Sequence, residues 1–551
     1  MDIKEKVVTA VLAAVKQAVE EKIFPEAEAP VVVLEVPPKK ELGDFATNFA
    51  MQSARVFRMP PRKIAEEVVG RLKGDWLDRA EIAGPGFINF FLKENVIYDS
   101  LAQIISMGDK FGILPAKDMK PVQIEYVSAN PTGPLHVGHG RGAAAGSALV
   151  NLLRAAGYPV KSEYYINDAG NQIDNLAASV NARYLELFGM NVEFPENGYH
   201  GADIIDTARR IKEKEGDKYL NLPEAERLSV FKEVALKEKL AALKEDLEAF
   251  NVTYDEWFSE RTLHPEAVSE AVSVLKENGN IYEKDGALWL RSTAYGDDKD
   301  RVVIRDNGIP TYLAADIAYH RNKFQRGFGK VINIWGADHH GYICRVKAAL
   351  SALGYNPDDL EVLLLQMVSL YRGGELVKMS KRTGESVTLA ELMEEVGTDA
   401  ARYFFVMRSL DSQLDFDLDL AKSESNENPV YYIQYAHARI CSIFRQIQEA
   451  GIVVSQSPEL QLLTDETEVA LIKKIEEYPE EVEKAAADYA PQRIARYVYE
   501  LAAGFHSFYS KCRIIGVEEA LAQARIALIG ETALVIRQAL KILGVSAPEK
   551  M

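Results

Sequence analysis

The amino-acid sequence predicts a multidomain α/β protein whose central region forms a parallel sheet, preceded by an α+β domain and followed by an all-α helical bundle. The chain has 551 residues, enough for three or four domains at roughly 100–200 residues each. From Pro121 strand-like runs alternate with helical runs, which is typical of a parallel sheet with crossover helices. After about Glu391 strand signals fade and long amphipathic helices continue to the end.

The first predicted domain covers residues 1–115. It opens with an amphipathic helix whose apolar positions include Val7, Val11, Leu12 and Val15, a pattern unlike that of a signal peptide. The runs "APVVVLEV" and "PGFINFFL" predict short strands. The polar stretch "MGDKFGILPAKDMK" contains Gly and Pro and predicts the linker that ends this domain.

The second predicted domain covers residues 116–390 and carries the parallel sheet. A charged helical stretch around 189–250 is predicted to be a solvated helical insertion. The run "RVVIRDNGIPTYL" predicts a hairpin, because Asn307-Gly308 tolerates the positive φ of a tight turn. The third predicted domain covers 391–551, with 391–425 as a connecting segment. Its aromatic stripe is interpreted as core: Tyr431, Tyr432, Tyr435 and Phe444.

Composition limits the class of protein. The three cysteines, Cys344, Cys441 and Cys512, lie far apart, which favours a reducing cytoplasm over a disulfide framework or a zinc ribbon. No apolar run is long enough to span a bilayer. The net charge of −18 argues against nucleic-acid binding, but the distribution of basic residues matters more than their sum, so charge alone leaves that partner open.

The stretch "PLHVGHGRGAAAG" follows a strand-like run and predicts a helix start. A helix N-terminus offers unpaired N–H groups to an anion, and Gly138 allows close approach of backbone to a ligand. His136 and His139, three residues apart, share one side of the first turn and can donate hydrogen bonds to phosphoryl oxygens. Two surface histidines are the simpler interpretation. A metal site is disfavoured because no Cys or carboxylate accompanies them at ligand spacing.

Far downstream, "ELVKMSKRTGESVTLAEL" places Lys378 and Lys381 around Met379 and Ser380. Two lysines on a loop can neutralise the charge shared between a leaving pyrophosphate and a transferred group. An exposed basic turn is the simpler interpretation of this run alone. "HVGH" and "KMSKR" together, in this order, resemble the HIGH and KMSKS elements of class I aminoacyl-tRNA synthetases, whose catalytic domain is Rossmann-like.

The resemblance sharpens to the arginyl-tRNA synthetase family and covers nearly the whole chain. "ELGDFATNFAM" is similar to the family's appended N-terminal domain, which touches the tRNA elbow, and the C-terminal helices resemble its anticodon-binding domain. The other stretches that carry the resemblance, in family order, are "SANPTGPLHVGHGRGA", "YYINDAGNQI", "WFSERTL", "TYLAADIAYH", "GADHHGY", "VKMSKRTG" and "DAARYFF".

The resemblance implies a reaction and a set of roles. An arginine–tRNA ligase activates L-arginine with ATP, as its Mg²⁺ complex and without zinc, and then transfers arginine to the 3′-terminal ribose of its tRNA. His136, His139, Lys378 and Lys381 are implied as catalytic. ATP is implied to bind at Gly138, Met379, Ser380 and Asp338, with Asp338 placed for the ribose. The family also implies a monomer in the cytoplasm with no membrane partner.

The arginine pocket is implied to contain Asn130, which binds the α-amino group, together with Glu260, Tyr312 and Asp316. One of His339 and His340 is expected to share the role of Asn130, and His340 is preferred. The chemistry agrees, because carboxylates are the best partners of a planar guanidinium and an aromatic ring can stack on it. Tyr312 and Asp316 are four residues apart and share one face of a helical turn. Without the resemblance, a core tyrosine and a solvated or capping carboxylate would be the preferred interpretations.

Three rival hypotheses remain at this stage: another class I synthetase, a nucleotidyltransferase that acts on a small molecule, and a non-catalytic paralogue that binds tRNA or a protein. If tRNA binds, basic residues must gather on one face despite the acidic total. The candidates are Lys39, Lys40, Arg55, Arg58, Arg62, Lys63, Arg372, Lys378, Lys381, Arg382, Arg439, Arg445, Arg493, Arg496, Lys511 and Arg513.

Overall fold

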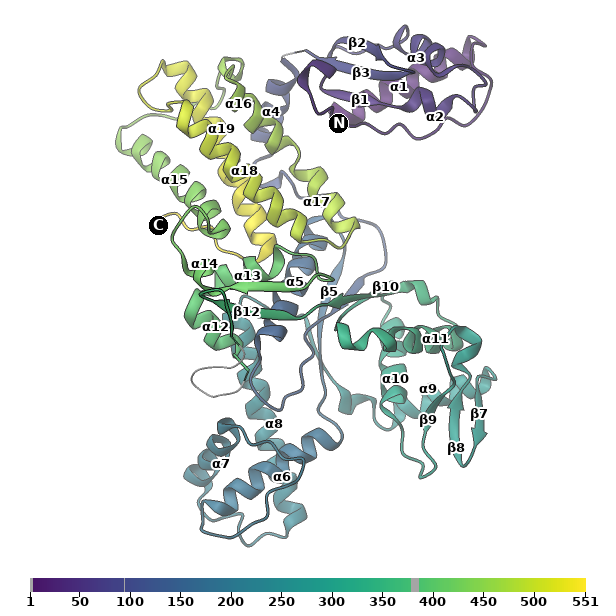
Figure 1. Cartoon of the computed structure of the whole chain (residues 1–551), viewed down its shortest axis with the longest axis vertical. Coiled ribbons are helices and arrows are strands. Elements are labelled where there is room, and N and C mark those ends of the chain that lie inside the picture. The colour runs from purple at the N-terminus through teal and green to yellow at the C-terminus, as the bar shows by residue number, and fades with distance from the viewer. Residues whose placement is uncertain (1–2, 94, 378–385) are drawn as a thin grey trace. The chain divides into compact units, whose positions relative to one another are not determined.

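The computed structural model describes residues 3–93, 95–377 and 386–551, and the chain divides into two compact units. Unit 1 contains 1–107, 455–476 and 516–528, and unit 2 contains the rest. Within the described ranges, no helix is long and apolar enough to cross a membrane. The multidomain α/β fold class predicted from the sequence is confirmed (Figure 1).

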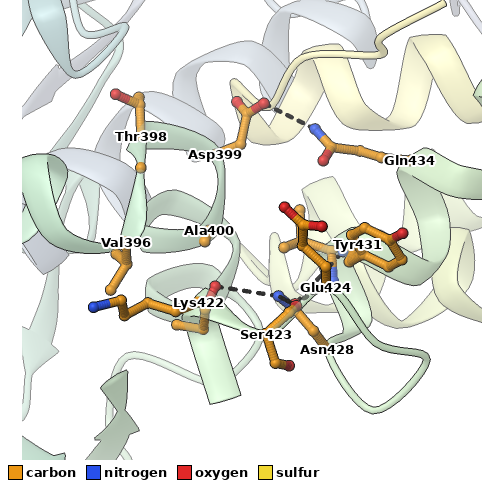
Figure 2. Close-up of a pocket in the computed structure, with 13 residues that line it drawn as sticks. Val396, Thr398, Asp399, Ala400, Lys422, Ser423, Glu424, Asn428, Tyr431 and Gln434 are labelled. Carbon is orange, nitrogen blue, oxygen red and sulfur yellow. Dashed lines mark hydrogen bonds between the residues drawn. The ribbon is translucent and has the colours of Figure 1, made fainter. Parts of the chain in front are cut away.

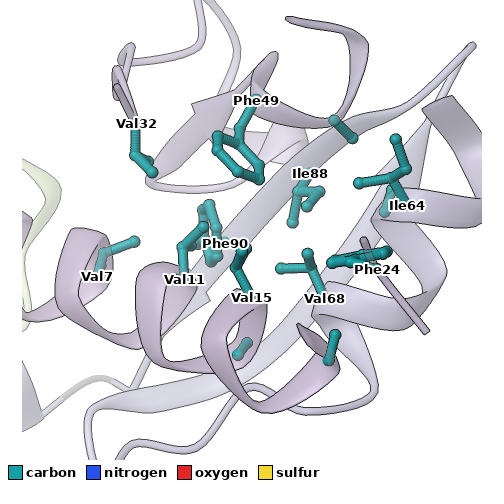
Figure 3. Packing of buried hydrophobic residues seen from close by; sticks show 14 of the residues in the cluster. Val7, Val11, Val15, Phe24, Val32, Phe49, Ile64, Val68, Ile88 and Phe90 are labelled. Carbon is teal, nitrogen blue, oxygen red and sulfur yellow. The ribbon is translucent and has the colours of Figure 1, made fainter. Parts of the chain in front are cut away.

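Unit 1 packs helices against a three-stranded antiparallel sheet of order β1-β3-β2. Figure 3 shows the core, where Val7, Val11 and Val15 meet Phe90 and Ile88 of the sheet. Its elements are α1 (Ile3–Glu20), β1 (Phe45–Thr47), α2 (Phe49–Ser53), α3 (Pro61–Val69), β2 (Leu77–Ala83), β3 (Phe87–Leu92), α4 (Asn95–Met107), α16 (Glu466–Glu476) and the first turns of α19 (Glu519–Leu543).

Two details of the N-terminal prediction were wrong. Leu12 is 42% exposed, because it lies on the solvent side of α1. The run "APVVVLEV" is extended but forms no strand. Glu35 makes a single bridge to Ala46, and only Val32 of its first three valines is buried. Apolar β-branched residues favour extended backbone, but a ladder also needs a partner strand of matching length, and β1 has three residues.

The centre of unit 2 is a parallel five-stranded sheet of order β11-β10-β4-β5-β6. Its strands are β4 (Val122–Glu125), β5 (Val160–Ile166), β6 (Glu256–Ser259), β10 (Lys330–Gly336) and β11 (Leu360–Leu365). The connecting helices are α5 (Val137–Ala155), α6 (Asn171–Glu186), α7 (Ala202–Glu215), α8 (Glu224–Ala249), α9 (Glu266–Glu277), α10 (Tyr312–Gln325) and α11 (Ile343–Leu353). Helices α6, α7 and α8 lie together (Figure 1). Their buried residues form a core of their own that includes Phe231.

Two small sheets accompany the large one. Strands β7 (Ile281–Lys284), β8 (Ala287–Leu290) and β9 (Arg301–Ile304) form an antiparallel sheet. The predicted hairpin is only half correct, because after β9 and its turn the second arm makes one bridge at Pro310 and then α10 begins. Proline cannot donate to a ladder, which explains why the arm stops there. The other sheet contains β12 (Val368–Arg372), β13 (Glu375–Val377) and β14 (Leu414–Asp417).

Helices make up the remainder of unit 2. They are α12 (Leu389–Val396), α13 (Thr398–Val406), α14 (Leu418–Lys422), α15 (Pro429–Glu449), α17 (Tyr478–Ala487), α18 (Gln492–Lys511) and the end of α19. The interpretation of the aromatic stripe as core was wrong. Tyr431, Tyr432, Tyr435 and Phe444 are all partly exposed, while Ile433 and Ile440 face the bundle. Helical spacing places residues on one face but does not say which face is covered.

Candidate active site

The order of the large sheet locates a crevice. β4 comes first in the chain and lies between β10 and β5, so the strand order reverses at β4. In open parallel sheets, ligands bind at the carboxyl ends of the strands where the order reverses. β4 leads into the HVGH turn and α5, and β10 leads into the residues of "GADHHGY". The two stretches that were predicted to contact ATP and arginine therefore start from neighbouring strands.

The turn after β4 is tightly held. Val127 and Ser128 adopt φ of 68° and 41°, a left-handed conformation that is a genuine outlier for a β-branched valine. The Ser128 hydroxyl donates to Glu125 Oε1 (2.9 Å) and accepts from the Tyr165 N–H (3.1 Å). Such backbone persists only where the surroundings impose it, and it is commonly found at functional sites. Here it lies in the segment that leads from β4 to Asn130.

The two histidines form a reciprocal cap at the start of α5. His136 Nδ1 accepts from the Gly138 and His139 N–H groups (3.1 and 3.4 Å), and His139 Nδ1 accepts from the His136 N–H (3.3 Å). The rings stack with centroids 3.7 Å apart. A ring nitrogen that accepts carries no proton, so in each neutral ring the proton lies on Nε2. Two imidazoles are thus held with Nε2–H as their free donor.

Burial keeps these rings neutral. It lowers the pKa of His136, and it lowers the pKa of His139 to about 4, with a further contribution from the charge of His136. At neutral pH both rings are therefore hydrogen-bond donors rather than cations. Together with the N–H groups and positive dipole end of α5, they form a donor array suited to phosphoryl oxygens.

Small residues behind the histidines allow α5 to sit close to its neighbours. A Cβ on Gly140 would lie 2.7 Å from Leu389 Cδ1, and a Cβ on Gly146 would lie 2.3 Å from the Tyr126 ring. Helix α5 therefore packs closely on the sheet, since Tyr126 directly follows β4. Leu389 belongs to the segment that follows the second motif.

That segment is paired with the HVGH turn. Thr388 bridges His136, the Leu389 N–H donates to Leu135 O (2.7 Å), and the Val137 N–H donates to Val387 O (3.2 Å). The second motif itself lies outside the described residues, including Lys378, Met379, Ser380 and Lys381. In the sequence, β13 ends directly before the second motif and Thr388 follows that motif closely, so the residue that bridges His136 is a near neighbour of the motif along the chain.

Glu260 and Asp316 come from separate segments, and the charges of both influence the Tyr165 hydroxyl. Both carboxylates raise the pKa of the Tyr165 hydroxyl, after burial as the main cause. Burial raises the pKa of Glu260, and it raises that of Asp316 to about 7, with contributions from the charges of Glu125 and Glu260. Buried acids whose pKa values rise together form a site that an incoming cation would stabilise.

A polar turn positions Glu260. Asp168 is buried and accepts from the Ser259 hydroxyl (2.6 Å) and the Arg261 N–H (3.1 Å), one residue on each side of Glu260. With its amide turned to satisfy its neighbours, Asn167 donates to Glu260 Oε2 (2.9 Å), and its oxygen lies 3.2 Å from the Asn130 amide. The run "YYINDAGNQI" thereby connects two residues that were predicted to bind arginine.

Comparison with known proteins identifies the family. Three family models match in order: "Arginyl tRNA synthetase N terminal domain" at 7–92, "tRNA synthetases class I (R), catalytic domain" at 100–409 and "DALR anticodon binding domain" at 433–551. The chain is 57% identical over 522 residues to an arginine–tRNA ligase of Carboxydothermus hydrogenoformans, covering 94% of each chain. The chain belongs to the arginyl-tRNA synthetase family.

Other relatives support this assignment. An arginine–tRNA ligase of Heliobacterium modesticaldum is 53% identical over 557 residues, covering 100% of this chain and 99% of the relative. The solved arginyl-tRNA synthetase of Thermus thermophilus shares the fold with a TM-score of 0.76 over the full length of both chains, at 23% identity. Two rival hypotheses, another class I synthetase and a small-molecule nucleotidyltransferase, do not account for this full-length similarity.

In this member of the arginyl-tRNA synthetase family, the remaining predicted residues lie on the surface. Tyr312 is the first residue of α10 and is 61% exposed. Asp338, His339 and His340 are exposed after β10, with His339 Nε2 3.5 Å from Asp338 Oδ2. Sequence reasoning missed Tyr342, whose hydroxyl donates to Asp316 Oδ2. It also missed Tyr165, although both tyrosines stand inside stretches that carry the family resemblance.

A separate pocket of about 340 cubic ångströms lies away from these residues (Figure 2). It is lined by the first turn of α13, the end of α14 and the start of α15. Asp399 on its wall accepts from Gln434 Nε2 (2.8 Å) and from the Ser546 N–H (2.9 Å). None of the predicted site residues that the structure describes lines the pocket, and the Asp399 carboxylate on its wall is already hydrogen-bonded.

Proposed function

We propose that this chain is an arginine–tRNA ligase that activates L-arginine with ATP and then transfers it to its tRNA. The observation that carries the proposal is the combination, at the carboxyl end of one sheet, of a neutral histidine pair with the buried Glu260 and the half-buried Asp316 near Tyr165. The first suits a triphosphate and the second suits a guanidinium. The full-length similarity to arginine–tRNA ligases supports the same activity.

Arginine binds through its side chain to Glu260 and Asp316, with Tyr312 beside the guanidinium. Its α-amino group binds Asn130 and one of the exposed histidines, with His340 preferred over His339. A ligand that lacks the guanidinium charge would leave the buried Glu260 and the half-buried Asp316 without a guanidinium partner, which costs several kcal/mol. This cost is the basis for discrimination against other amino acids.

ATP binds at the start of α5, with the Nε2–H groups of His136 and His139 and the backbone at Gly138 directed to phosphoryl oxygens and Asp338 to the ribose. Lys378, Met379, Ser380 and Lys381 complete the site. An arginine carboxylate oxygen attacks the α-phosphorus, the bond to the bridging oxygen breaks and pyrophosphate leaves. A ribose hydroxyl of tRNA then attacks the carbonyl carbon of arginyl-adenylate, and AMP leaves. Positioning and charge stabilisation perform most of the work.

Magnesium enters with ATP in this proposal and neutralises phosphate charge when bound. Among the described residues, no group of three or more His, Cys, Asp or Glu side chains is arranged to hold a metal ion. Mg²⁺ is commonly held mainly by phosphate oxygens and water, so the proposal assigns it no protein ligand set. The proposal includes no zinc.

The tRNA is proposed to contact domains 1–115 and 391–551, which flank the catalytic domain at 116–390. The partly exposed rings of α15 and α18 suit unstacked bases, and the Arg439 guanidinium lies 4.5 Å from the Tyr435 ring centroid and 4.7 Å from that of Tyr509. Several other candidate basic residues are ion-paired: Arg62–Glu66 (3.6 Å), Arg372–Glu395 (2.7 Å), Arg493–Glu481 (2.8 Å) and Arg496–Glu500 (2.8 Å).

A matched pair of variants tests this tRNA surface. Arg439→Gln should weaken tRNA binding and flatten its salt dependence, because a cation in contact with tRNA releases counterions when tRNA binds. Arg496→Gln changes an exposed arginine that is already paired, and it should have little effect. Filter binding at several salt concentrations measures both variants. A tRNA affinity that does not fall with rising salt would contradict the proposed surface.

The activity is tested by ATP–pyrophosphate exchange over all twenty amino acids, with and without bulk tRNA. Arginine alone should support exchange, and only with tRNA present. Exchange with another amino acid would remove the Glu260–Asp316 pocket from the proposal. Folded protein that binds tRNA but exchanges nothing would favour the non-catalytic paralogue. The enzyme is further proposed to act as a cytoplasmic monomer, which light scattering and cell fractionation would check.

A further inference from the structure

Tyr342 is the residue of the candidate site that contacts the Asp316 carboxylate. Its hydroxyl donates a hydrogen bond to Asp316 Oδ2. Over residues 3–93, 95–377 and 386–551, Oδ1 of the same carboxylate has no hydrogen-bond partner. One oxygen is thus held by the protein while the other is available to a ligand.

The Tyr342 ring is itself held from two sides. It ends the short 3-10 helix Ala337–Tyr342 and immediately precedes α11. It meets the Trp335 ring edge-on at 6.1 Å, and the Arg345 guanidinium lies 5.3 Å from its centroid. Burial, followed by the charge of Asp316, raises the pKa of the hydroxyl well above its ordinary value, so the proton stays on Tyr342. The side chain is a fixed, neutral donor.

We propose that Tyr342 is a positioning residue that determines arginine specificity: it holds Asp316 Oδ2, presents Oδ1 to the guanidinium, and keeps the carboxylate charged when arginine binds. This inference rests on the proposed arginine-binding role of Asp316. It adds a residue from the segment after β10, which also contains Asp338 and His340. The 3-10 helix Ala337–Tyr342 therefore connects Asp338, the predicted ribose-binding residue, with Tyr342, which holds the Asp316 carboxylate.

The surroundings of Asp316 explain why one hydroxyl matters. Burial is the main cause of its raised pKa, and the Glu125 and Glu260 charges raise it further, whereas the Tyr342 hydrogen bond is the largest opposing effect. Without that bond the pKa rises above about 7, so at neutral pH the acid is mostly protonated. A protonated acid no longer pairs with a guanidinium. The groups that face Asp316 are Glu125 from β4, Tyr165 from β5, Glu260 after β6, His320 and Lys323 from α10, and Tyr342.

The test is Tyr342→Phe, assayed by pyrophosphate exchange with tRNA between pH 6.5 and 8.5. The arginine KM at pH 7 should rise roughly 10- to 100-fold, as expected for losing a hydrogen bond to a charged group. The rise should shrink at higher pH, where Asp316 ionises without help. The kcat and the ATP KM should stay within about twofold, since the histidine pair is untouched.

Tyr355→Phe is the matched control. It removes the same hydroxyl from a tyrosine packed against the same apolar cluster, where its ring stacks on Phe324 with centroids 5.0 Å apart. Its arginine KM and pH profile should match those of the unmodified chain. A second check adds Tyr342→Phe to Asp316→Asn. The added change should then leave the arginine KM nearly unaltered, because the two residues act through one hydrogen bond.

The outcomes separate this inference from the proposed function. If the unmodified chain does not use arginine, the proposed function fails and the inference falls with it. If the unmodified chain uses arginine but Tyr342→Phe has an unchanged arginine KM across the pH range, only the inference is overturned. A pH-independent loss of kcat with a lowered melting temperature would indicate a merely structural role and would also overturn it.

Discussion

The histidine pair at the start of α5 and the carboxylate pair around Tyr165 are both partly removed from water, and burial moves all four groups toward their neutral forms. For His136 and His139 the neutral form is the useful one, because Nε2–H then donates to phosphate. For Glu260 and Asp316 the neutral form is the wrong one, because only a carboxylate pairs with a guanidinium. The histidine pair therefore has its useful protonation state before ATP binds. The carboxylate pair becomes fully charged only when arginine binds.

The largest effect should come from Asp316→Asn, which removes one of the two charges. The arginine KM should rise roughly 100- to 1000-fold, because a partly buried guanidinium is left incompletely paired. The ATP KM should change little, since the histidine pair does not contact Asp316. Exchange kinetics with each substrate varied in turn measure both constants. Asp285→Asn, in the exposed turn between β7 and β8, is the control. Unchanged arginine kinetics would remove Asp316 from the pocket.

The histidine side can be dissected by comparing His136→Asn with His136→Ala. Both variants lose the Nε2–H donor, so kcat should fall about a hundredfold in each. Asparagine can still accept from the backbone as a helix cap, whereas alanine cannot and should cost about 1 kcal/mol more of stability. Single-turnover assays and thermal melting separate the two effects. Equal kcat in His136→Asn and the unmodified chain would show that the ring does not reach the phosphates.

A pH series should distinguish the two sides without any substitution. Asp316, with its pKa raised to about 7, loses charge as the pH falls, so the arginine KM should rise roughly fivefold from pH 7 to 6. His139, with its pKa lowered to about 4, stays neutral throughout, so the ATP KM should remain flat. Parallel titration of the two constants checks this. A parallel rise in both constants would contradict the comparison.

The smallest effect concerns stability. Because the folded-state pKa of Asp316 lies above its unfolded value, its neutral form contributes stability that is complete below about pH 4 and is lost as pH rises through about 7. Arginine supplies the missing positive charge, so it should raise the melting temperature more at pH 8 than at pH 6. Calorimetry with saturating arginine measures the difference. The same shift at both pH values would show that the charge of Asp316 does not matter for binding.

The histidine cap shows how much local sequence can predict. Its partners lie within three residues, so the spacing of His136 and His139 was enough to predict a shared side of one turn, and the structure adds which nitrogens accept. The strand–helix alternation likewise predicted the parallel sheet, because hydrophobic periodicity acts over a few residues. Predictions failed where a partner was needed, as for the half-formed hairpin at Pro310 and the partly exposed aromatic stripe of α15.

By itself the sequence determined the start of α5 with its two histidines on one side, the type of the central sheet and, through motifs spread along the chain, the family. Tertiary structure alone decided that Tyr342 holds Asp316 and that Asp168 and Asn167 hold Glu260. It also decided that burial lowers the pKa values of His136 and His139 and raises those of Glu260 and Asp316. The physical reason is the separation along the chain between the groups that interact. A cap depends on backbone groups a few residues away, whereas a pKa depends on solvent exclusion and on charges from segments far apart in the chain.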